Sequence, residues 1–211
     1  MTDQATTAAA APGAADPWIA HLWPGSDATP VLRALRVTIL ALVGAQLLWL
    51  SAKTQVPFWP VPLTMQTLAV MLLGLAFGWR LAAATVVLYL AQGAVGMPVF
   101  AGTPERGIGA VYMVGPTGGY LLGFVLAAAV VGAIVSRASG ASPVVFRLTV
   151  VVALLVGILA IYLPGYLWLA KFIGFAKAWG FGVLPFIIGD LIKVGIAATL
   201  AFAVHLRLRR T

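Results

Sequence analysis

The stretch Pro185-Phe186-Ile187-Ile188-Gly189-Asp190-Leu191-Ile192-Lys193 places a carboxylate and an ammonium inside an otherwise apolar segment. Asp190 and Lys193 stand three residues apart, so on a helix they share a face. No other carboxylate or cation lies well inside an apolar segment of this chain. An ionisable group at membrane depth costs about 2.5–3.5 kcal/mol on insertion scales, and such groups usually face a cavity, a partner or a ligand. The stretch therefore indicates a polar site within a membrane protein.

The composition of the whole chain agrees with a membrane location. Of its 211 residues, 62% are apolar and only 9% are charged, and the mean hydropathy is +1.05. A soluble domain of this size has no means of covering so much apolar surface. The long apolar runs suit helices that cross a ~30 Å hydrocarbon core better than the alternating strands of a barrel. We therefore predict an all-α integral membrane protein that is embedded in a lipid bilayer.

Several function classes are disfavoured by what the sequence contains. The net charge is +8, but the basic residues sit singly between apolar segments, which does not favour nucleic-acid binding. The chain has no cysteine, which excludes disulfides and thiol catalysis. His21 and His205 lie near the chain ends without metal-ligand spacing, and no Gly-Lys dipeptide offers a phosphate loop. We expect neither an enzyme nor a resident cofactor.

The apolar runs divide the chain into a tail and six spans. Residues 1–30, rich in Ala, Thr, Pro and Asp, are predicted to be a disordered N-terminal tail, and residues 31–211 form one transmembrane domain. The second and third spans are short and separated by little more than Arg80, so we expect a tight hairpin. The predicted spans are residues 31–51, 63–79 and 81–95, a fourth that opens at the turn 115–120 and ends at 136, a fifth from after Arg147 to 170, and 183–206.

The basic residues between the spans predict the orientation. Eight of them belong to the termini and the even-numbered loops, and four belong to the other side, so the positive-inside rule favours cytoplasmic termini. The last span then descends from outside, which puts Asp190 and Lys193 about 10–15 Å below the outer surface. The two groups are Arg33, Arg36, Arg80, Arg137, Arg147, Arg207, Arg209 and Arg210 against Lys53, Arg106, Lys171 and Lys177.

Three further polar residues are predicted near the same membrane side. Gln66 begins one arm of the expected hairpin and Gln92 ends the other, so both side chains come to one side. Arg106 lies in the loop after the third span, where a guanidinium is able to grip a carboxylate. Each has a plainer interpretation as well: a structural ion pair for Asp190 with Lys193, interhelical hydrogen bonds for the glutamines, and an exposed loop charge for Arg106.

Four motifs, in this order, give the chain a resemblance to a known family. Together they span most of the chain after residue 31, and the glycine-proline turn alone would be weak. They resemble the BioY family, the biotin-binding substrate-capture (S) components of energy-coupling factor transporters. The motifs are Pro60-Val61-Pro62-Leu63-Thr64-Met65-Gln66-Thr67-Leu68-Ala69-Val70, Gly93-Ala94-Val95-Gly96-Met97-Pro98-Val99-Phe100-Ala101-Gly102, Gly115-Pro116-Thr117-Gly118-Gly119-Tyr120-Leu121-Leu122-Gly123-Phe124 and Gly189-Asp190-Leu191-Ile192-Lys193.

The resemblance implies a six-helix S-component bundle that captures biotin outside the cell and works in the bacterial cytoplasmic membrane. Its implied partners are a transmembrane coupling protein (T component) and ABC-type ATPase subunits, which agrees with the lack of a phosphate loop in this chain. Family ligand contacts map onto Asp190, Lys193 and Gln92 around the bicyclic head of biotin, and onto Arg106 and Gln66 near its tail. The family often has asparagine where this chain has Gln92.

The resemblance also implies a partner-binding motif. Ala41 and Ala45, in the first span, match the small-residue spacing through which such components meet the coupling protein.

Other functions remain open on the sequence alone. The chain is also compatible with a capture component for another vitamin. A solitary ion-coupled secondary transporter would use protonation of Asp190 as its switch. A purely structural membrane protein would bind no ligand.

Overall fold

The computed structural model of the protein describes residues 18, 29–138 and 140–208. Within this part, five helical stretches are long and apolar enough to cross a membrane. The predicted disordered tail lies almost entirely outside the described residues and stays a prediction; only its last residue, Pro30, belongs to a long helix. The stretches are α2 (Pro30–Lys53), α3 (Gln66–Ala94), α5 (Gly118–Ser136), α6 (Pro143–Ile173), and α7 (Phe175–Gly182) together with α8 (Leu184–Leu208).

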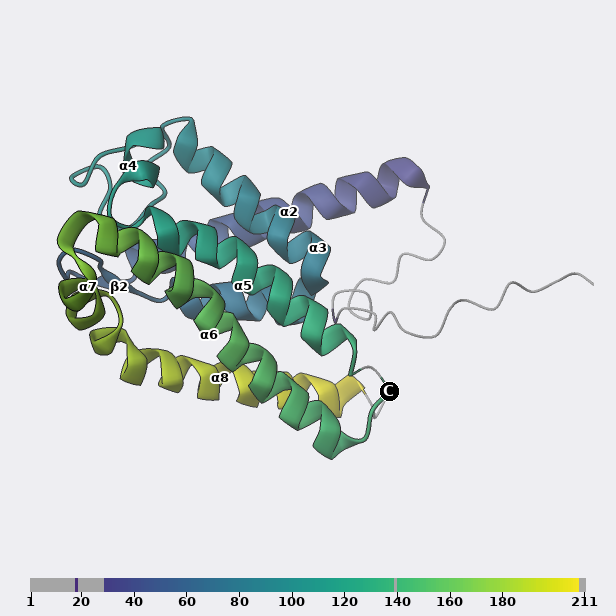
Figure 1. Ribbon diagram of the computed structural model, residues 1–211. Coiled ribbons are helices and arrows are strands. Elements are labelled where there is room, and N and C mark those ends of the chain that lie inside the picture. Colours follow the sequence, from purple (N-terminus) through teal and green to yellow (C-terminus); the bar gives the residue numbers. More distant parts are fainter. Residues whose placement is uncertain (1–17, 19–28, 139, 209–211) are drawn as a thin grey trace, which may run out of the picture.

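The helix α3 is the expected hairpin. Gly78 has φ 71° and ψ 170°, a left-handed conformation that breaks the helix and that side chains other than glycine rarely adopt. Its two halves run in opposite directions, so six apolar segments form the bundle (Figure 1). The prediction of six spans with a tight turn between the second and third is confirmed, although the break is at Gly78 rather than at Arg80.

Two helices begin at a hydroxyl residue followed by proline. Thr29 and Ser142 accept hydrogen bonds from the backbone N–H groups three residues on, and a proline stands in the first turn of α2 and of α6. Such caps satisfy amides that the helix leaves unpaired, and proline at that position gives up no bond. They explain why both helices start where the sequence changes from polar to apolar.

The packing of α5 against α6 depends on glycines. A Cβ atom at Gly123 would lie 2.7 Å from Cα of Ile161, so only glycine permits this close approach. Ser136 ends α5, and the loop that follows leads into α6, which continues through Pro164 to Ile173. The fifth span is thus longer than the predicted end at residue 170, and the next loop contains the short helix α7.

One end of the bundle collects the irregular segments. The two-stranded hairpin of β1 (Gln55–Val56) and β2 (Leu63–Thr64), the short helix α4 (Ala110–Val114) and α7 lie there (Figure 1). The break in α3 and the C-terminal end of α8 lie at the opposite end (Figure 1). Asp190 is in the second turn of α8, on the side of the loops.

Candidate binding site

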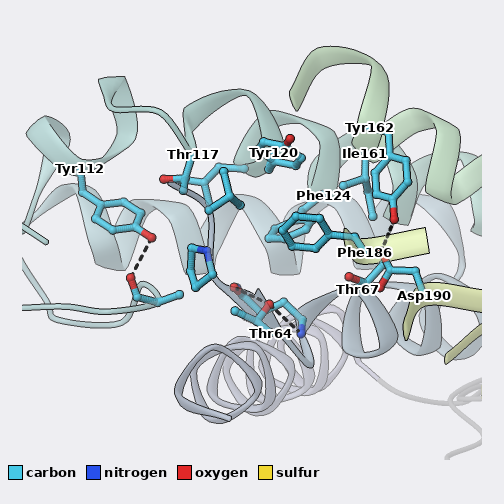
Figure 2. Close-up of a pocket in the computed structure, with 15 residues that line it drawn as sticks. Thr64, Thr67, Tyr112, Thr117, Tyr120, Phe124, Ile161, Tyr162, Phe186 and Asp190 are labelled. Carbon is cyan, nitrogen blue, oxygen red and sulfur yellow. Dashed lines mark hydrogen bonds between the residues drawn. The ribbon is translucent and has the colours of Figure 1, made fainter. Parts of the chain in front are cut away.

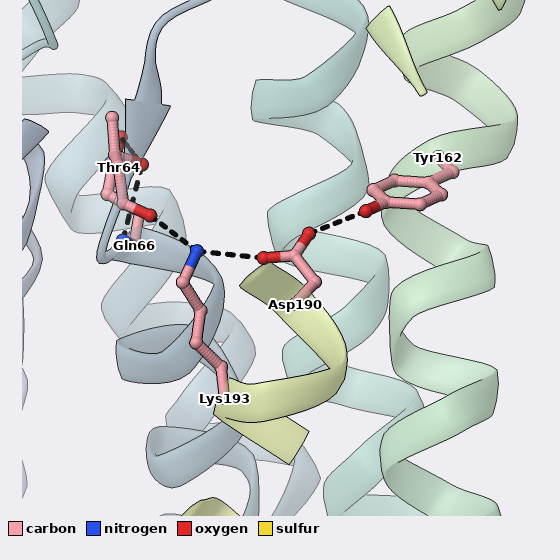
Figure 3. A network of polar contacts seen from close by, with 5 residues as sticks. All are labelled: Thr64, Gln66, Tyr162, Asp190 and Lys193. Atoms are coloured by element: carbon pink, nitrogen blue, oxygen red, sulfur yellow. Dashed lines mark hydrogen bonds and ion pairs between the residues drawn. The ribbon is translucent and has the colours of Figure 1, made fainter. Parts of the chain in front are cut away.

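Asp190 and Lys193 form the centre of a polar network that joins three parts of the chain. The Lys193 ammonium donates to Oδ1 of Asp190 at 2.8 Å and to the carbonyl oxygen of Thr64, which follows the proline-rich loop, at 2.7 Å. The Tyr162 hydroxyl on α6 donates to Oδ2 of Asp190 at 2.7 Å (Figure 3). The side chains of Asp190 and Lys193 are only 3% and 13% exposed. The predicted pairing of these two residues on one helix face is present in the structure.

This network borders a cavity of about 50 Å³ near the loop end of the bundle. Its walls come from the end of the first loop, the start of α3, the loop after α3 with α4, the start of α5, the middle of α6 and the start of α8 (Figure 2). Most of the lining is apolar or aromatic. The lining residues are Val61, Pro62, Thr64, Gln66, Thr67, Ala101, Tyr112, Thr117, Tyr120, Leu121, Phe124, Ile161, Tyr162, Phe186 and Asp190.

The network leaves hydrogen-bonding capacity for a ligand. A carboxylate has about four acceptor sites and an ammonium three donors. Within the described residues, Asp190 accepts two hydrogen bonds and Lys193 donates two. Lys193 does not line the cavity itself, but its ammonium bridges Thr64 and Asp190, which do. A largely apolar chamber lined by a carboxylate that is paired with an ammonium suits a small molecule that carries both N–H donors and a carbonyl.

Gln66 also lies in the cavity wall. It is 3% exposed, and its side-chain amide donates to the Tyr89 hydroxyl at 3.0 Å. Tyr89 in turn donates to the carbonyl oxygen of Val99, also at 3.0 Å. The structure therefore brings Gln66 to the same cavity as Asp190 and fixes its side chain through the second half of α3.

Arg106 does not line the cavity. Its guanidinium donates to the carbonyl oxygens of Pro60 at 3.1 Å and Phe58 at 2.9 Å, so it fastens its own loop to the proline-rich loop. Lys53, at the end of α2, has a similar role, since its ammonium donates to the carbonyl oxygens of Phe100 and Thr103. The two cations hold together the loops that cover the cavity.

Aromatic side chains also stabilise the loops that cover the cavity. Phe100 stacks on Tyr112 with ring centroids 4.8 Å apart, and the Tyr112 hydroxyl donates to the carbonyl oxygen of Ala101 at 2.8 Å. Burial raises the pKa of the Tyr112 phenol above its ordinary value. The group therefore stays a neutral donor well into alkaline pH.

The remaining predicted residues lie apart from the cavity. Gln92 is half-buried, and its side-chain oxygen has no hydrogen-bond partner within the described part of the chain. Ala41 and Ala45 are buried in the bundle, at 9% and 0% exposure, where α2 packs against α3. The roles predicted for all three residues stay predictions.

Sequence reasoning missed Tyr162 and Lys53. Tyr162 belongs to a long apolar run, where its hydroxyl needs a partner once buried, and this was the available signal. Choosing Asp190 as that partner required knowing the relative depth of α6 and α8. Lys53 had no distinguishing signal, because it resembles any cation at the end of a span.

Comparison with known proteins gives the family. The BioY family profile matches residues 25–210. The chain belongs to the BioY family. It is 39% identical over 170 residues to the probable biotin transporter BioY of Pyrococcus horikoshii, covering 81% of this chain and 96% of that protein. It is 36% identical over 179 residues to the biotin transporter BioY of Thermotoga maritima, covering 81% and 92%.

A solved structure supports the fold independently. The crystal structure of the S-component for biotin from an ECF-type ABC transporter superposes with a TM-score of 0.69, covering 87% of this chain and 96% of that one. The two sequences are only 21% identical, so this match speaks for the fold alone. The resemblance seen in the four sequence motifs is confirmed, and the protein is a multi-pass membrane protein of this family.

Proposed function

We propose that this BioY-family protein captures biotin with high affinity as the S component of an energy-coupling factor transporter. The observation that carries the proposal is the Asp190–Lys193 pair at the wall of a largely apolar cavity. The ureido ring of biotin offers two N–H donors to the carboxylate and one carbonyl to the ammonium. Membership of a family whose relatives are named biotin transporters supports the same ligand. The protein is therefore a transport protein and not an enzyme.

The partners and the location follow from this role. A T component and ABC-type ATPase subunits would supply the energy for release, and the membrane would be the bacterial cytoplasmic membrane with both termini inside. The charge distribution supports this orientation: Lys53, Arg106, Lys171 and Lys177 belong to the loop end of the bundle, which would face outward.

Biotin binding requires the cavity to grow. Pockets for small organic ligands measure about 300–1,000 Å³, whereas this cavity measures about 50 Å³. One wall is the end of the proline-rich loop, which a two-residue strand pairing and Arg106 hold in place. We infer that this loop moves outward to admit biotin and closes over it afterwards.

The test measures equilibrium binding of biotin to the detergent-purified chain alone, by isothermal titration calorimetry. We expect tight binding in the wild type and about tenfold to hundredfold weaker binding in Lys193→Ala, since a charged hydrogen bond contributes about 1.5–3 kcal/mol. Lys177→Ala, which removes an exposed lysine of α7, is the matched control and should bind as the wild type does. Unchanged affinity in Lys193→Ala would refute the ligand assignment.

Two further measurements separate the alternatives. Thiamine and riboflavin should fail to compete with biotin; competition by either would favour another vitamin. Uptake into vesicles that is driven by a proton gradient, without ATPase partners, would favour a solitary transporter.

A further inference from the structure

A second hollow lies on the outer surface of the bundle, between α6, α7 and α8. It is an open groove of about 660 Å³, far larger than the internal cavity. Leu159, Ala160 and Leu163 of α6 line one side, and Val183 and Ile187 line the other. The lining is almost wholly apolar.

The groove continues along the same two helices toward the polar network. A smaller hollow of about 200 Å³ shares Leu159, Tyr162 and Ile187 with it and ends at Asp190 and Leu191. Tyr162 and Asp190 also line the internal cavity. The hydrogen bond between these two residues therefore belongs to a wall one side chain thick, with the internal cavity on one side and the groove on the other.

The position and lining of the groove specify what covers it. Both α6 and α8 belong to stretches that cross the membrane, so the groove opens into the hydrocarbon of the bilayer. At its α7 end stand Tyr166 and Trp179, whose rings suit the boundary between acyl chains and headgroups. Lys171 and Lys177, both exposed, lie in the adjoining chain segments, and no carboxylate occurs in residues 164–189. The Lys171 ammonium lies 4.9 Å from the centre of the Trp168 ring, at the same end of α6. An apolar channel with cations at one end is complementary to a lipid whose apolar acyl chain is joined to a phosphate group.

We propose that one membrane phospholipid occupies this groove, with an acyl chain along α6 and α8 and its phosphate at the end of the groove where Lys171 and Lys177 lie. The chain then covers the outer face of Tyr162. Because Tyr162 holds Asp190 in place for the internal cavity, the bound lipid supports the site from the membrane side. This goes beyond biotin capture and does not depend on it.

The experiment counts phospholipids on the full-length protein by native mass spectrometry. The purified protein is delipidated by detergent washing and titrated with dioleoylphosphatidylglycerol. The test variant is Leu159→Trp, which fills the groove from a position that is already 64% exposed. The control is Leu126→Trp on α5, where the leucine is 43% exposed and does not line the groove.

The control lies at a matched membrane depth. A Cβ at Gly123 would meet Ile161 at 2.7 Å, and a Cβ at Gly157 would lie 4.0 Å from Ala127. Leu126 is therefore level with Leu159 on the neighbouring helix. Any effect of a bulky ring at that depth on ordinary surrounding lipid is the same in both variants.

We expect one phospholipid to bind the wild type and Leu126→Trp with similar affinity. Binding to Leu159→Trp should be at least about tenfold weaker, because losing the burial of only two methylenes of the acyl chain already weakens binding by about that factor. Equal retention in all three proteins, equal loss in both variants, or a protein dimer in place of the lipid would overturn the proposal.

A second variant pair keeps the test valid if Leu159→Trp does not fold. Lys171→Gln with Lys177→Gln changes two exposed side chains and removes the contact of Lys171 with the Trp168 ring, which lies outside the groove. It should weaken phosphatidylglycerol binding and reduce its salt dependence. Unchanged binding there would also refute the proposal. The lipid count is made without biotin, so the two proposals are tested separately. Absence of bound lipid would not contradict biotin capture, and absence of biotin binding would not contradict the lipid site.

Discussion

Asp190→Asn should separate the structural from the ligand-binding role of the polar network. The substitution keeps the shape of the side chain but removes its charge. The Lys193 ammonium, which is 13% exposed, then keeps the Thr64 carbonyl as an acceptor and loses its charged partner. At the 2.8 Å separation of the pair, an effective dielectric constant of about 20 gives an attraction of about 6 kcal/mol. Breaking one partner of a buried pair costs about 3–5 kcal/mol in practice.

The lower end of this range is expected, since Lys193 retains a little solvent contact. A loss of about 3 kcal/mol lowers the melting temperature of a chain of this size by roughly 6–12 °C. Thermal unfolding in detergent, followed by tryptophan fluorescence, measures the shift. Biotin affinity should fall by about tenfold to hundredfold at the same time, because the acceptor of the ureido N–H groups loses its charge.

The double variant Asp190→Asn/Lys193→Met decides between the two roles. It removes both charges and keeps the length of the lysine stem, so most of the lost stability should return. Biotin affinity should stay low, since the ligand still lacks its charged partners. A double variant as unstable as Asp190→Asn would refute the electrostatic account of stability. Wild-type affinity in both variants would refute the placement of the ligand at this pair.

Three further predictions concern other parts of the site and fold. Tyr162→Phe removes the donor to Asp190 Oδ2 and should destabilise the protein by about 1.5–3 kcal/mol in thermal unfolding, with weaker biotin binding in calorimetry. Arg106→Gln should loosen the two loops and speed their amide hydrogen exchange, whereas Glu105→Gln beside it should not. Gly123→Ala should lower the melting temperature sharply because its Cβ meets the Ile161 backbone, whereas Gly195→Ala, with open space around it, should raise stability by about 0.5–1 kcal/mol; the reverse order would contradict the packing.

The sequence predicted those features that depend on residues close together in the chain. Asp190 and Lys193 are three residues apart, so helix geometry alone puts them on one face. The hairpin in α3 was predicted because two apolar runs, each short for a spanning helix, follow one another with almost no loop between them. These features needed no knowledge of which helices are neighbours.

Features that depend on the relative depth of distant segments were not predictable. Tyr162 meets Asp190 across 28 positions of the chain, and Lys193 meets Thr64 across 129. No periodicity in one segment contains that information. The same applies to Arg106, whose loop position was predicted but whose carbonyl partners lie 46 and 48 residues away.

Under the proposed function, the position of Arg106 would link closure of the proline-rich loop to capture of the ligand. In this structure the guanidinium binds two neutral carbonyl oxygens of the proline-rich loop. The carboxylate of biotin is a stronger acceptor for a guanidinium, because both partners are charged and the contact is bidentate. Opening of the loop would free Arg106, and a carboxylate at the mouth of the cavity would then compete with the two carbonyl oxygens for the guanidinium. Under the proposed function, the carboxylate of biotin would compete with the Pro60 and Phe58 carbonyls for Arg106, so loop opening and biotin capture would depend on the same hydrogen bonds.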